Sequence, residues 1–249
     1  MEDQATPLLD VRGLTKRFKD ITAIDHVSFQ ARRGEIFGLL GPNGAGKTTT
    51  IRVISTVLSV TEGTATVDGF DIRKAPEEVK KQLGVLTTDI GVYERFTGRE
   101  NLRYFAALYG MSPDRTEKRI DELLDLLDMR DFADRRSGTY STGMKQKLAI
   151  ARSVIHDPDL IFFDEPTAGL DVLAARTVVR FMERARDHGK CVVFSTHILH
   201  EAEKLCTRVA IIHRGIVVGD GTVESLEHAT TTSNLEDAFL ALVGKERRS

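Results

Sequence analysis

The chain has 249 residues, of which 41 % are hydrophobic and 29 % charged, enough to bury a large core in one extended domain. Its 35 Lys and Arg nearly balance 37 Asp and Glu, and the basic pairs are scattered, which disfavours nucleic acid as the main ligand. Two cysteines without metal spacing fit packing roles in a reducing cytosol. No apolar run is long enough to span a membrane, so any membrane role needs another chain.

The N-terminal third is predicted to be rich in β-structure. Leu8–Phe18 and Val27–Ala31 alternate like strands, and Glu35–Leu40 is a short apolar strand that ends at a glycine loop. The residues after that loop have helical spacing. Further strands are predicted at 64–72, with a turn at Asp68–Gly69, and at 83–86.

From about residue 97 to residue 155 the pattern becomes helical, with Ile120, Leu123, Leu124 and Leu127 on one apolar face. Apolar strands then alternate with helical patterns, which predicts a parallel sheet covered on both faces. The expected strands are 160–163, 191–195 and 209–213, followed by a hairpin at Arg214–Gly215 and a last helix at 235–243.

The segment GPNGAGKT fits the phosphate-loop pattern G-x-x-x-x-G-K-[ST], with a predicted strand before it and a helix after it. Its glycines let backbone N–H groups wrap phosphates at a helix N-terminus. Lys47 is expected to pair the β- and γ-phosphates of ATP, and the Thr48 hydroxyl to ligate Mg²⁺. The candidate nucleotide contacts are Gly41, Pro42, Asn43, Gly44, Ala45, Gly46, Lys47, Thr48 and Thr49.

The apolar run LIFFDEP delivers Asp164 and Glu165 to the carboxyl end of a strand, where open α/β sheets bind ligands. Asp164 is expected to hold Mg²⁺, and Glu165 to polarise the water that attacks the γ-phosphate. The alternative is that the two carboxylates cap a turn. His197 follows the next strand and could donate to the γ-phosphate, whereas the other six histidines are expected on turns or surfaces.

Taken in order, GPNGAGKT, YSTGM, LIFFDEP, AGLD and STH resemble the nucleotide-binding subunit of an ABC (ATP-binding cassette) transporter over nearly the whole chain. The resemblance implies an α/β P-loop NTPase fold with a RecA-like parallel-sheet core, an N-terminal antiparallel β subdomain and an inserted helical subdomain. One domain, 1–249, is then expected, with a β subdomain and phosphate-loop part at 1–90, a helical subdomain at 91–156, the rest of the core at 157–222 and a helical tail at 223–249.

The resemblance also implies a head-to-tail homodimer, in which Ser141 and Gly143 of one subunit face the ATP held by the other. The usual family motif is LSGGQ, so Thr142 and Met144 depart from it. A hydroxyl and an open backbone N–H at a helix start can still grip a γ-phosphate. Ser141 alone would equally suit an ordinary helix cap.

Three further residues take roles from the resemblance. Asp171 in AGLD corresponds to the residue that contacts the partner subunit, and an N-cap role is equally good chemistry. Phe18 corresponds to the aromatic that stacks on adenine, with a core role as the alternative. Thr88 stands where the family carries a glutamine that touches Mg²⁺; it is shorter, and Asp89 is a possible substitute.

The chain most resembles the NatA-type ATPases of bacterial sodium-export systems in two segments, LTTDIGVYERFTGREN and YSTGMKQKLAIARS. Related exporters of drugs and polysaccharides have the same sequence pattern. This implies a cytoplasmic subunit, peripheral on the inner face of the membrane, that hydrolyses ATP to drive a separate permease docked on the helical insertion around 89–103. Two alternatives are an ABC-type ATPase outside transport and a P-loop enzyme that phosphorylates a small molecule; the second leaves YSTGM and STH unexplained.

Overall fold

Two β-sheets and a group of helices make up the structure, a computed structural model that describes residues 6–87 and 91–246. The first sheet is antiparallel, with strand order β2-β1-β4-β5. Its longest strands, β1 and β2, are joined by a tight turn and expose residues of one face to solvent, as antiparallel sheets commonly do. The strands are β1 (Leu9–Phe18), β2 (Ile21–Ala31), β4 (Glu62–Val67) and β5 (Phe70–Asp71).

The second sheet has the order β10-β9-β3-β8-β7-β6, and its strands from β9 to β6 run parallel to one another. Every residue of β3, β7 and β8 is buried, because helices and the first sheet cover both faces. This confirms the expected parallel sheet. The strands are β3 (Ile36–Leu40), β6 (Leu83–Leu86), β7 (Leu160–Asp164), β8 (Cys191–Thr196), β9 (Arg208–His213) and β10 (Ile216–Gly221).

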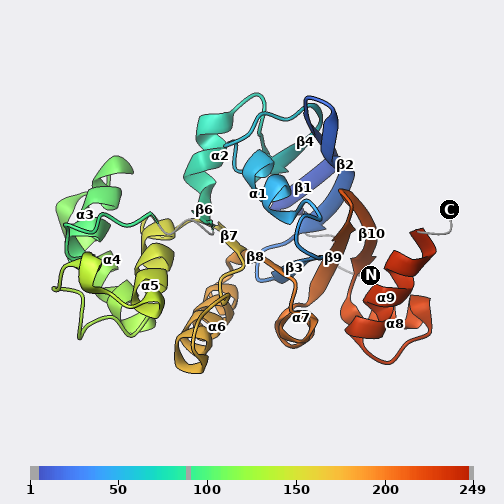
Figure 1. The fold of residues 1–249 in the computed structure, drawn as a ribbon. Coiled ribbons are helices and arrows are strands. Elements are labelled where there is room, and N and C mark those ends of the chain that lie inside the picture. Colours follow the sequence, from blue (N-terminus) through green and yellow to red (C-terminus); the bar gives the residue numbers. More distant parts are fainter. Residues whose placement is uncertain (1–5, 88–90, 247–249) are drawn as a thin grey trace.

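The helices gather in three places (Figure 1). Helices α3 to α5 form the bundle at one end of the molecule, α8 and α9 lie at the other end beside β10, and the rest pack on the sheets. The apolar face predicted from Ile120 to Leu127 is fully buried in the bundle. The helices are α1 (Lys47–Ile54), α2 (Pro76–Gln82), α3 (Gly98–Leu108), α4 (Pro113–Leu126), α5 (Thr142–Ser153), α6 (Val172–Asp187), α7 (Leu199–Leu205), α8 (Val223–Thr230) and α9 (Leu235–Glu246).

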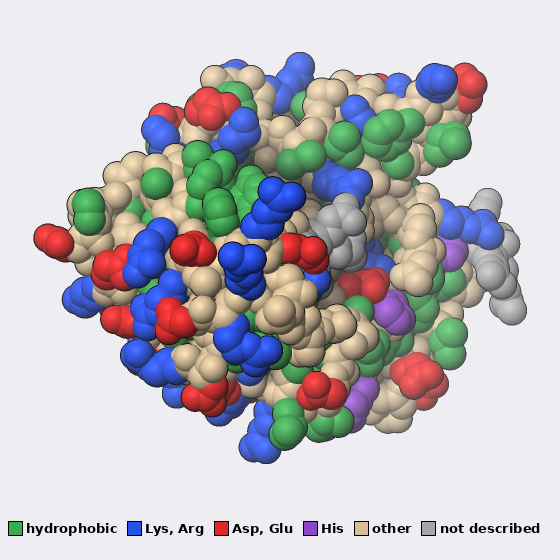
Figure 2. Space-filling model, turned by 60° about the vertical axis from the view of Figure 1, so that its left-hand side comes forward, with side chains coloured by type: hydrophobic (Ala, Val, Ile, Leu, Met, Phe, Trp, Pro, Cys, Tyr) green, Lys and Arg blue, Asp and Glu red, His purple; other side chains and the backbone are tan. Residues whose placement is uncertain are grey.

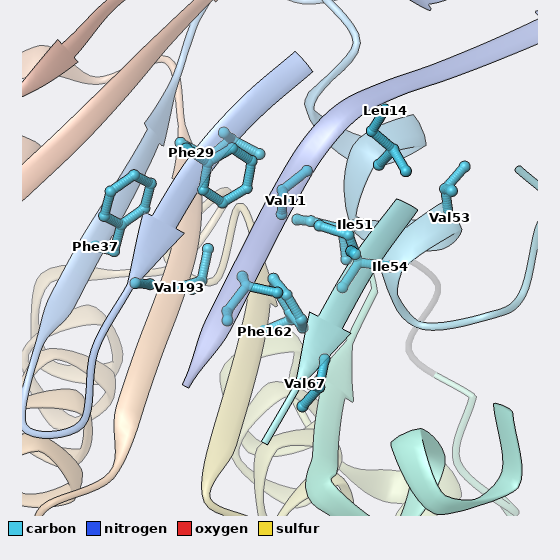
Figure 3. Close-up of a cluster of buried hydrophobic side chains, with 14 of the residues drawn as sticks. Val11, Leu14, Phe29, Phe37, Ile51, Val53, Ile54, Val67, Phe162 and Val193 are labelled. Carbon is cyan, nitrogen blue, oxygen red and sulfur yellow. The ribbon is translucent and has the colours of Figure 1, made fainter. Parts of the chain in front are cut away.

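The main hydrophobic core lies between the two sheets and includes α1 (Figure 3). Phe29 of the antiparallel sheet stacks on Phe37 of β3 with 5.2 Å between ring centroids, and Ile51 and Ile54 of α1 pack against Phe162 of β7. A second core, which includes residues of α5 and α6, lies on the other face of the parallel sheet. The two cores fix the carboxyl ends of β3, β7 and β8 in place.

One histidine that was expected on a turn or at the surface is buried in a strand instead. His213 is 8 % exposed at the end of β9. His156 stacks flat on Tyr109, with ring centroids 3.7 Å apart, and its Nε2 lies 2.9 Å from the Leu83 carbonyl. Burial lowers the pKa of His156 to about 4. The prediction failed for His213, because it is the last residue of β9, in which every residue from Val209 on is buried; His156 lies in the turn after α5, as expected, and is only partly buried.

Both cysteines take part in hydrophobic packing. Cys191 is buried in β8, and Cys206 packs between the parallel sheet and α7, so both serve packing as expected. Burial raises the pKa of both thiols. Among the described residues, none of the helices has the length and apolar character needed to cross a membrane.

Candidate nucleotide site

The ends of three neighbouring strands bring the candidate catalytic segments together. Leu40 of β3 pairs with Thr196 of β8, and Asp164 of β7 pairs with Ser195 of β8, so these parallel strands end at one edge of the sheet. The phosphate loop, Glu165 and His197 each follow one of these strands. The structure therefore brings together residues that lie about 30 to 150 positions apart in the chain, as the strand pattern predicts.

The phosphate loop needs glycine at its two ends for steric reasons. A Cβ on Gly41 would lie 2.2 Å from the carbonyl oxygen of Ile212. Gly46 has φ of 112°, and a Cβ there would lie 2.7 Å from Ile24 and 2.9 Å from the Ala23 carbonyl. Because Gly46 precedes α1 and has no side chain, the first N–H groups of this helix remain open to an anion.

Lys47 lies almost fully inside the loop and is only 4 % exposed. Its Nζ donates to the Gly41 carbonyl at 2.7 Å and to the Pro42 carbonyl at 3.2 Å, and lies 3.7 Å from Glu165 Oε1. Burial lowers the pKa of Lys47, and the carboxylates of Glu165 and Asp164 oppose that shift. A buried ammonium bound mainly by neutral carbonyls is a ready partner for a stronger anion such as phosphate.

Asp164 collects two hydroxyl donors at the end of β7 and is 2 % exposed. The Thr48 hydroxyl donates to its Oδ2 at 2.7 Å, and the Ser195 hydroxyl donates to its Oδ1 at 2.5 Å. Carboxylate and hydroxyl oxygens are hard ligands that suit Mg²⁺. Within the described ranges no cluster of three or more His, Cys, Asp or Glu side chains could hold a metal ion. The residues fit a cation that the nucleotide's own phosphates help to bind.

Glu165 is held in an unusual backbone conformation, with φ of 49°. Its N–H donates to the carbonyl and to the hydroxyl of Ser195, at 3.1 and 3.2 Å. Its Oε1 lies 3.1 Å from Nδ1 of His197. The carboxylate therefore faces His197 on one side and Lys47 on the other. A positive φ is uncommon for a residue such as Glu165 that is neither Gly nor Asn, and strained positions of this kind cluster at functional sites.

A pocket of about 430 Å³ opens over the phosphate loop. Its lining includes Asn43 to Thr49 and Glu165, together with residues that no motif had indicated: Ile21, Thr22, Ala23 and Arg214. Phe18 is not part of the lining. It is 43 % exposed, pairs with Ile21 across the β1–β2 turn, and lies below Nζ of Lys16 at 5.1 Å.

The family model described as ABC transporter matches residues 24–168, more than half of the chain. The chain belongs to the ABC transporter family. It is accordingly an ATPase subunit with the ABC fold, and ATP is its nucleotide.

Individual relatives agree with the family. The chain is 42 % identical over 239 residues to the ABC transporter ATP-binding protein NatA of Bacillus subtilis, covering 94 % of this chain and 97 % of that protein. It is 39 % identical over 227 residues to the daunorubicin/doxorubicin resistance ATP-binding protein DrrA of Streptomyces peucetius, covering 91 % and 69 %. A solved structure of an ATP-binding subunit of an ABC transporter superposes with a TM-score of 0.88 at 31 % identity, covering 95 % and 99 % of the chains.

The family motif around Ser141 lies apart from the phosphate-loop pocket in this ABC ATPase. Ser141 is the N-cap of α5, and its hydroxyl accepts from the Met144 N–H at 3.3 Å. Gly143 lies close to the start of α6, where an added Cβ would be 3.1 Å from Cβ of Ala174. Both residues line a separate depression of about 660 Å³, which shares no residue with the lining of the phosphate-loop pocket. One chain does not bring Ser141 and Gly143 to Lys47.

Asp171 closes the other side of this depression. Its carboxylate accepts from the N–H groups of Leu173 and Ala174, both at 2.9 Å, which makes it the N-cap of α6. The two residues after it, Val172 and Leu173, are 82 % and 77 % exposed. The N-cap role of Asp171 is thus established, and it leaves apolar side chains facing solvent beside the depression. Thr88 and Asp89, expected near the Mg²⁺ site, lie outside the described residues.

Proposed function

We propose that this ABC ATPase binds two ATP molecules across a head-to-tail homodimer and drives a separate membrane permease of an export system. The observation that carries the proposal is the presence of two different half-sites on one chain. Lys47, Asp164 and Glu165 line or border one pocket, and Ser141 and Gly143 line another. Two copies arranged head to tail would turn four half-sites into two complete ones.

In each complete site, the phosphate loop holds the triphosphate and Lys47 exchanges its carbonyl partners for the β- and γ-phosphates. Thr48 and Asp164 would hold Mg²⁺, which offsets negative charge on the phosphates when it is bound. Phe18 contacts the adenine from the β1–β2 turn, beside Ile21. Ser141 and Gly143 of the other subunit approach the γ-phosphate from the opposite side.

Hydrolysis depends on Glu165, which takes a proton from the attacking water. His197 donates a hydrogen bond to the γ-phosphate and orients Glu165 through their 3.1 Å contact. Catalysis consists mainly of positioning and electrostatic stabilisation, since the reaction needs little covalent chemistry from the protein. This assignment explains why a carboxylate occupies a strained backbone position beside a buried lysine.

The permease would dock on the bundle side of the molecule. Tyr93, Phe96 and Tyr104 are 47 %, 37 % and 41 % exposed, although they pack against one another. Next to them a groove of about 660 Å³ runs between α2 and α3, with Leu108 and Tyr109 at its edge. Figure 2 shows hydrophobic side chains gathered in a patch on the face where this end comes forward. Such a patch fits a short apolar helix of a partner.

Glu165→Gln tests the ATPase mechanism. The amide keeps the size of the side chain but cannot accept a proton, so ATP binding should persist while turnover falls by about a hundredfold or more. ATP should then trap a dimer that size-exclusion chromatography separates from the monomer. Glu224→Gln, at an exposed position of α8, is the matched control and should hydrolyse normally. Hydrolysis by the Glu165 variant at the wild-type rate would show that Glu165 is not the base.

Sodium is the transported ion that we propose, because the chain matches NatA over almost the full length of both proteins. The alternative, export of a drug, rests on the match to DrrA. Vesicles that contain this ATPase and the membrane protein encoded beside it should show ATP-dependent sodium flux, and a parallel assay with doxorubicin distinguishes the alternative. If these vesicles show no ATP-dependent sodium flux, the sodium proposal is wrong and the ATPase assignment remains intact.

A further inference from the structure

Arg214 lies at the same sheet edge as the catalytic residues but on the other side of the phosphate loop. It occupies the turn between β9 and β10, and β9 is the neighbour of β3 opposite to β8 (Figure 1). Glu165 and His197 follow β7 and β8. The phosphate loop, which follows β3, is therefore flanked by the catalytic pair on one side and by Arg214 on the other.

The turn that carries Arg214 is fixed to the phosphate loop by its backbone. The Gly215 N–H donates to the Ala45 carbonyl at 2.9 Å, and the Gly215 carbonyl accepts from the Asp25 N–H at 2.8 Å. Gly215 fits closely against β2, because an added Cβ would lie 2.9 Å from the Ala23 carbonyl. These contacts place Arg214 at a set distance from the loop, with its own backbone in the left-handed region at φ of 47°.

The charge of Arg214 is available for a ligand. Arg214 lines the pocket of about 430 Å³ over the phosphate loop, and within the described part of the chain its side chain forms no ion pair or hydrogen bond. An arginine held beside a phosphate-binding loop without a carboxylate partner matches the geometry and charge of a phosphate group. Lys47, by contrast, is already engaged inside the loop and lies close to Glu165.

We propose that Arg214 is a second cation for the bound nucleotide and contacts its phosphates nearer the ribose than Lys47 does. The inference rests on the proposed function, since it assumes that ATP occupies this pocket. Glu165 and His197 mark the γ-phosphate end, and Arg214 lies across the loop from them, next to Ile21 to Ala23 at the start of β2. Arg214 therefore strengthens binding of both ATP and ADP and takes no part in the cleavage step.

The test compares Arg214→Gln and Arg214→Lys with the wild type by calorimetric titration of ATP, ADP and adenosine. Arg214→Gln should raise Kd for ATP and ADP by about fivefold to twentyfold, whereas Arg214→Lys should stay within about threefold. Binding of adenosine, which lacks phosphates, should not change. In steady-state assays KM for ATP should rise while kcat stays within about twofold. Arg115→Gln, an exposed arginine on α4, is the control and should bind all three ligands normally.

The outcomes separate this inference from the proposed function. A wild-type protein that neither binds nor hydrolyses ATP would refute the proposed function itself. If the wild type is active and Arg214→Gln binds ATP and ADP normally, only the role of Arg214 is wrong. Equal weakening of adenosine binding would show that Arg214 shapes the pocket rather than binds phosphate. Weakening of ATP alone, with ADP unchanged, would place Arg214 at the γ-phosphate and also overturn the proposal.

Discussion

At the scale of single residues, Asp164 links the phosphate loop to the neighbouring strand β8. It accepts from Thr48 on the loop and from Ser195 on the neighbouring strand, and it is almost inaccessible to solvent. A buried carboxylate depends strongly on such donors, because an unsatisfied buried acceptor costs about 1 to 3 kcal/mol. Thr48 therefore contributes to stability as well as to the proposed Mg²⁺ site.

Thr48→Val tests both contributions, because it keeps the shape of the side chain and removes the hydroxyl. We expect the free energy of unfolding to fall by about 1 to 3 kcal/mol and Mg²⁺-dependent ATPase activity to fall at least about tenfold. Urea denaturation and assays at graded Mg²⁺ concentrations measure the two effects. Thr48→Ser keeps the donor and should remain close to the wild type in both. If Thr48→Val needs no more Mg²⁺ than the wild type for half-maximal activity, Thr48 is not a ligand.

Some residues of the site can be recognised from the sequence and others cannot. Asp164, Glu165 and His197 were predictable at this edge because each lies at or just after the end of an apolar strand, and Lys47 because it belongs to a glycine-rich loop between such a strand and a helix. Ile21 was not, since it enters the pocket only when the β1–β2 turn packs beside the loop, and Arg214 was overlooked. The rule about strand ends could have indicated Arg214, which follows β9 just as His197 follows β8.

At the scale of secondary-structure elements, His156 joins the bundle to the parallel sheet. Its ring stacks on Tyr109 at the end of α3 and contacts the carbonyl of Leu83, the first residue of β6. Its Nδ1 is buried and has no hydrogen-bond partner among the described residues. Protonation of this ring would place a charge in a poorly solvated junction, which is why burial dominates the lowered pKa.

This junction predicts that stability depends on pH. The pKa of His156 is about 4 in the folded protein and near the ordinary value of 6.5 when the chain is unfolded. Between those values the unfolded chain binds the extra proton, so the free energy of unfolding should fall as the pH drops from 6.5 to 4, by at most about 1.4 kcal/mol per pH unit. His156→Phe keeps a stacked ring and should have a flatter profile over this range. If urea unfolding shows the same change in the free energy of unfolding between pH 7 and pH 5 for the wild type and for His156→Phe, the assignment is wrong.

The elements that a sequence predicts well are those with one dominant pattern. Strands β6 and β7 read as uninterrupted apolar runs because helices and the first sheet cover the two faces of their sheet. Helix α2 was missed, since it has seven residues and buries only Val79. Strand β2 begins at Ile21 rather than at Val27, because its first residues are exposed and its pairing with β1 is irregular. Such features are set by tertiary pairing and leave no periodic signal.

At the scale of the whole molecule, the separation of the two half-sites has a measurable consequence. A Lys47→Met chain keeps its Ser141 side intact, and a Gly143→Leu chain keeps its phosphate loop intact, although Leu would press against Ala174. Each variant alone should be inactive. In an equal mixture, half of the dimers combine the two chains and hold one complete site, so activity should recover to about a quarter of the wild-type value. Absence of recovery, with mixed dimers verified by differently tagged chains, would reject the shared site.

The left-handed backbone conformation of Glu165 lowers the stability of the molecule. A residue with a Cβ in the left-handed region is disfavoured by about 1 to 2 kcal/mol, so Glu165→Gly should be about 1 kcal/mol more stable in thermal unfolding than Glu165→Ala. Under the proposed mechanism, glycine there would strengthen the fold but remove the base. The proposed catalytic role of Glu165 thus implies that stability of the fold is traded for turnover at this position.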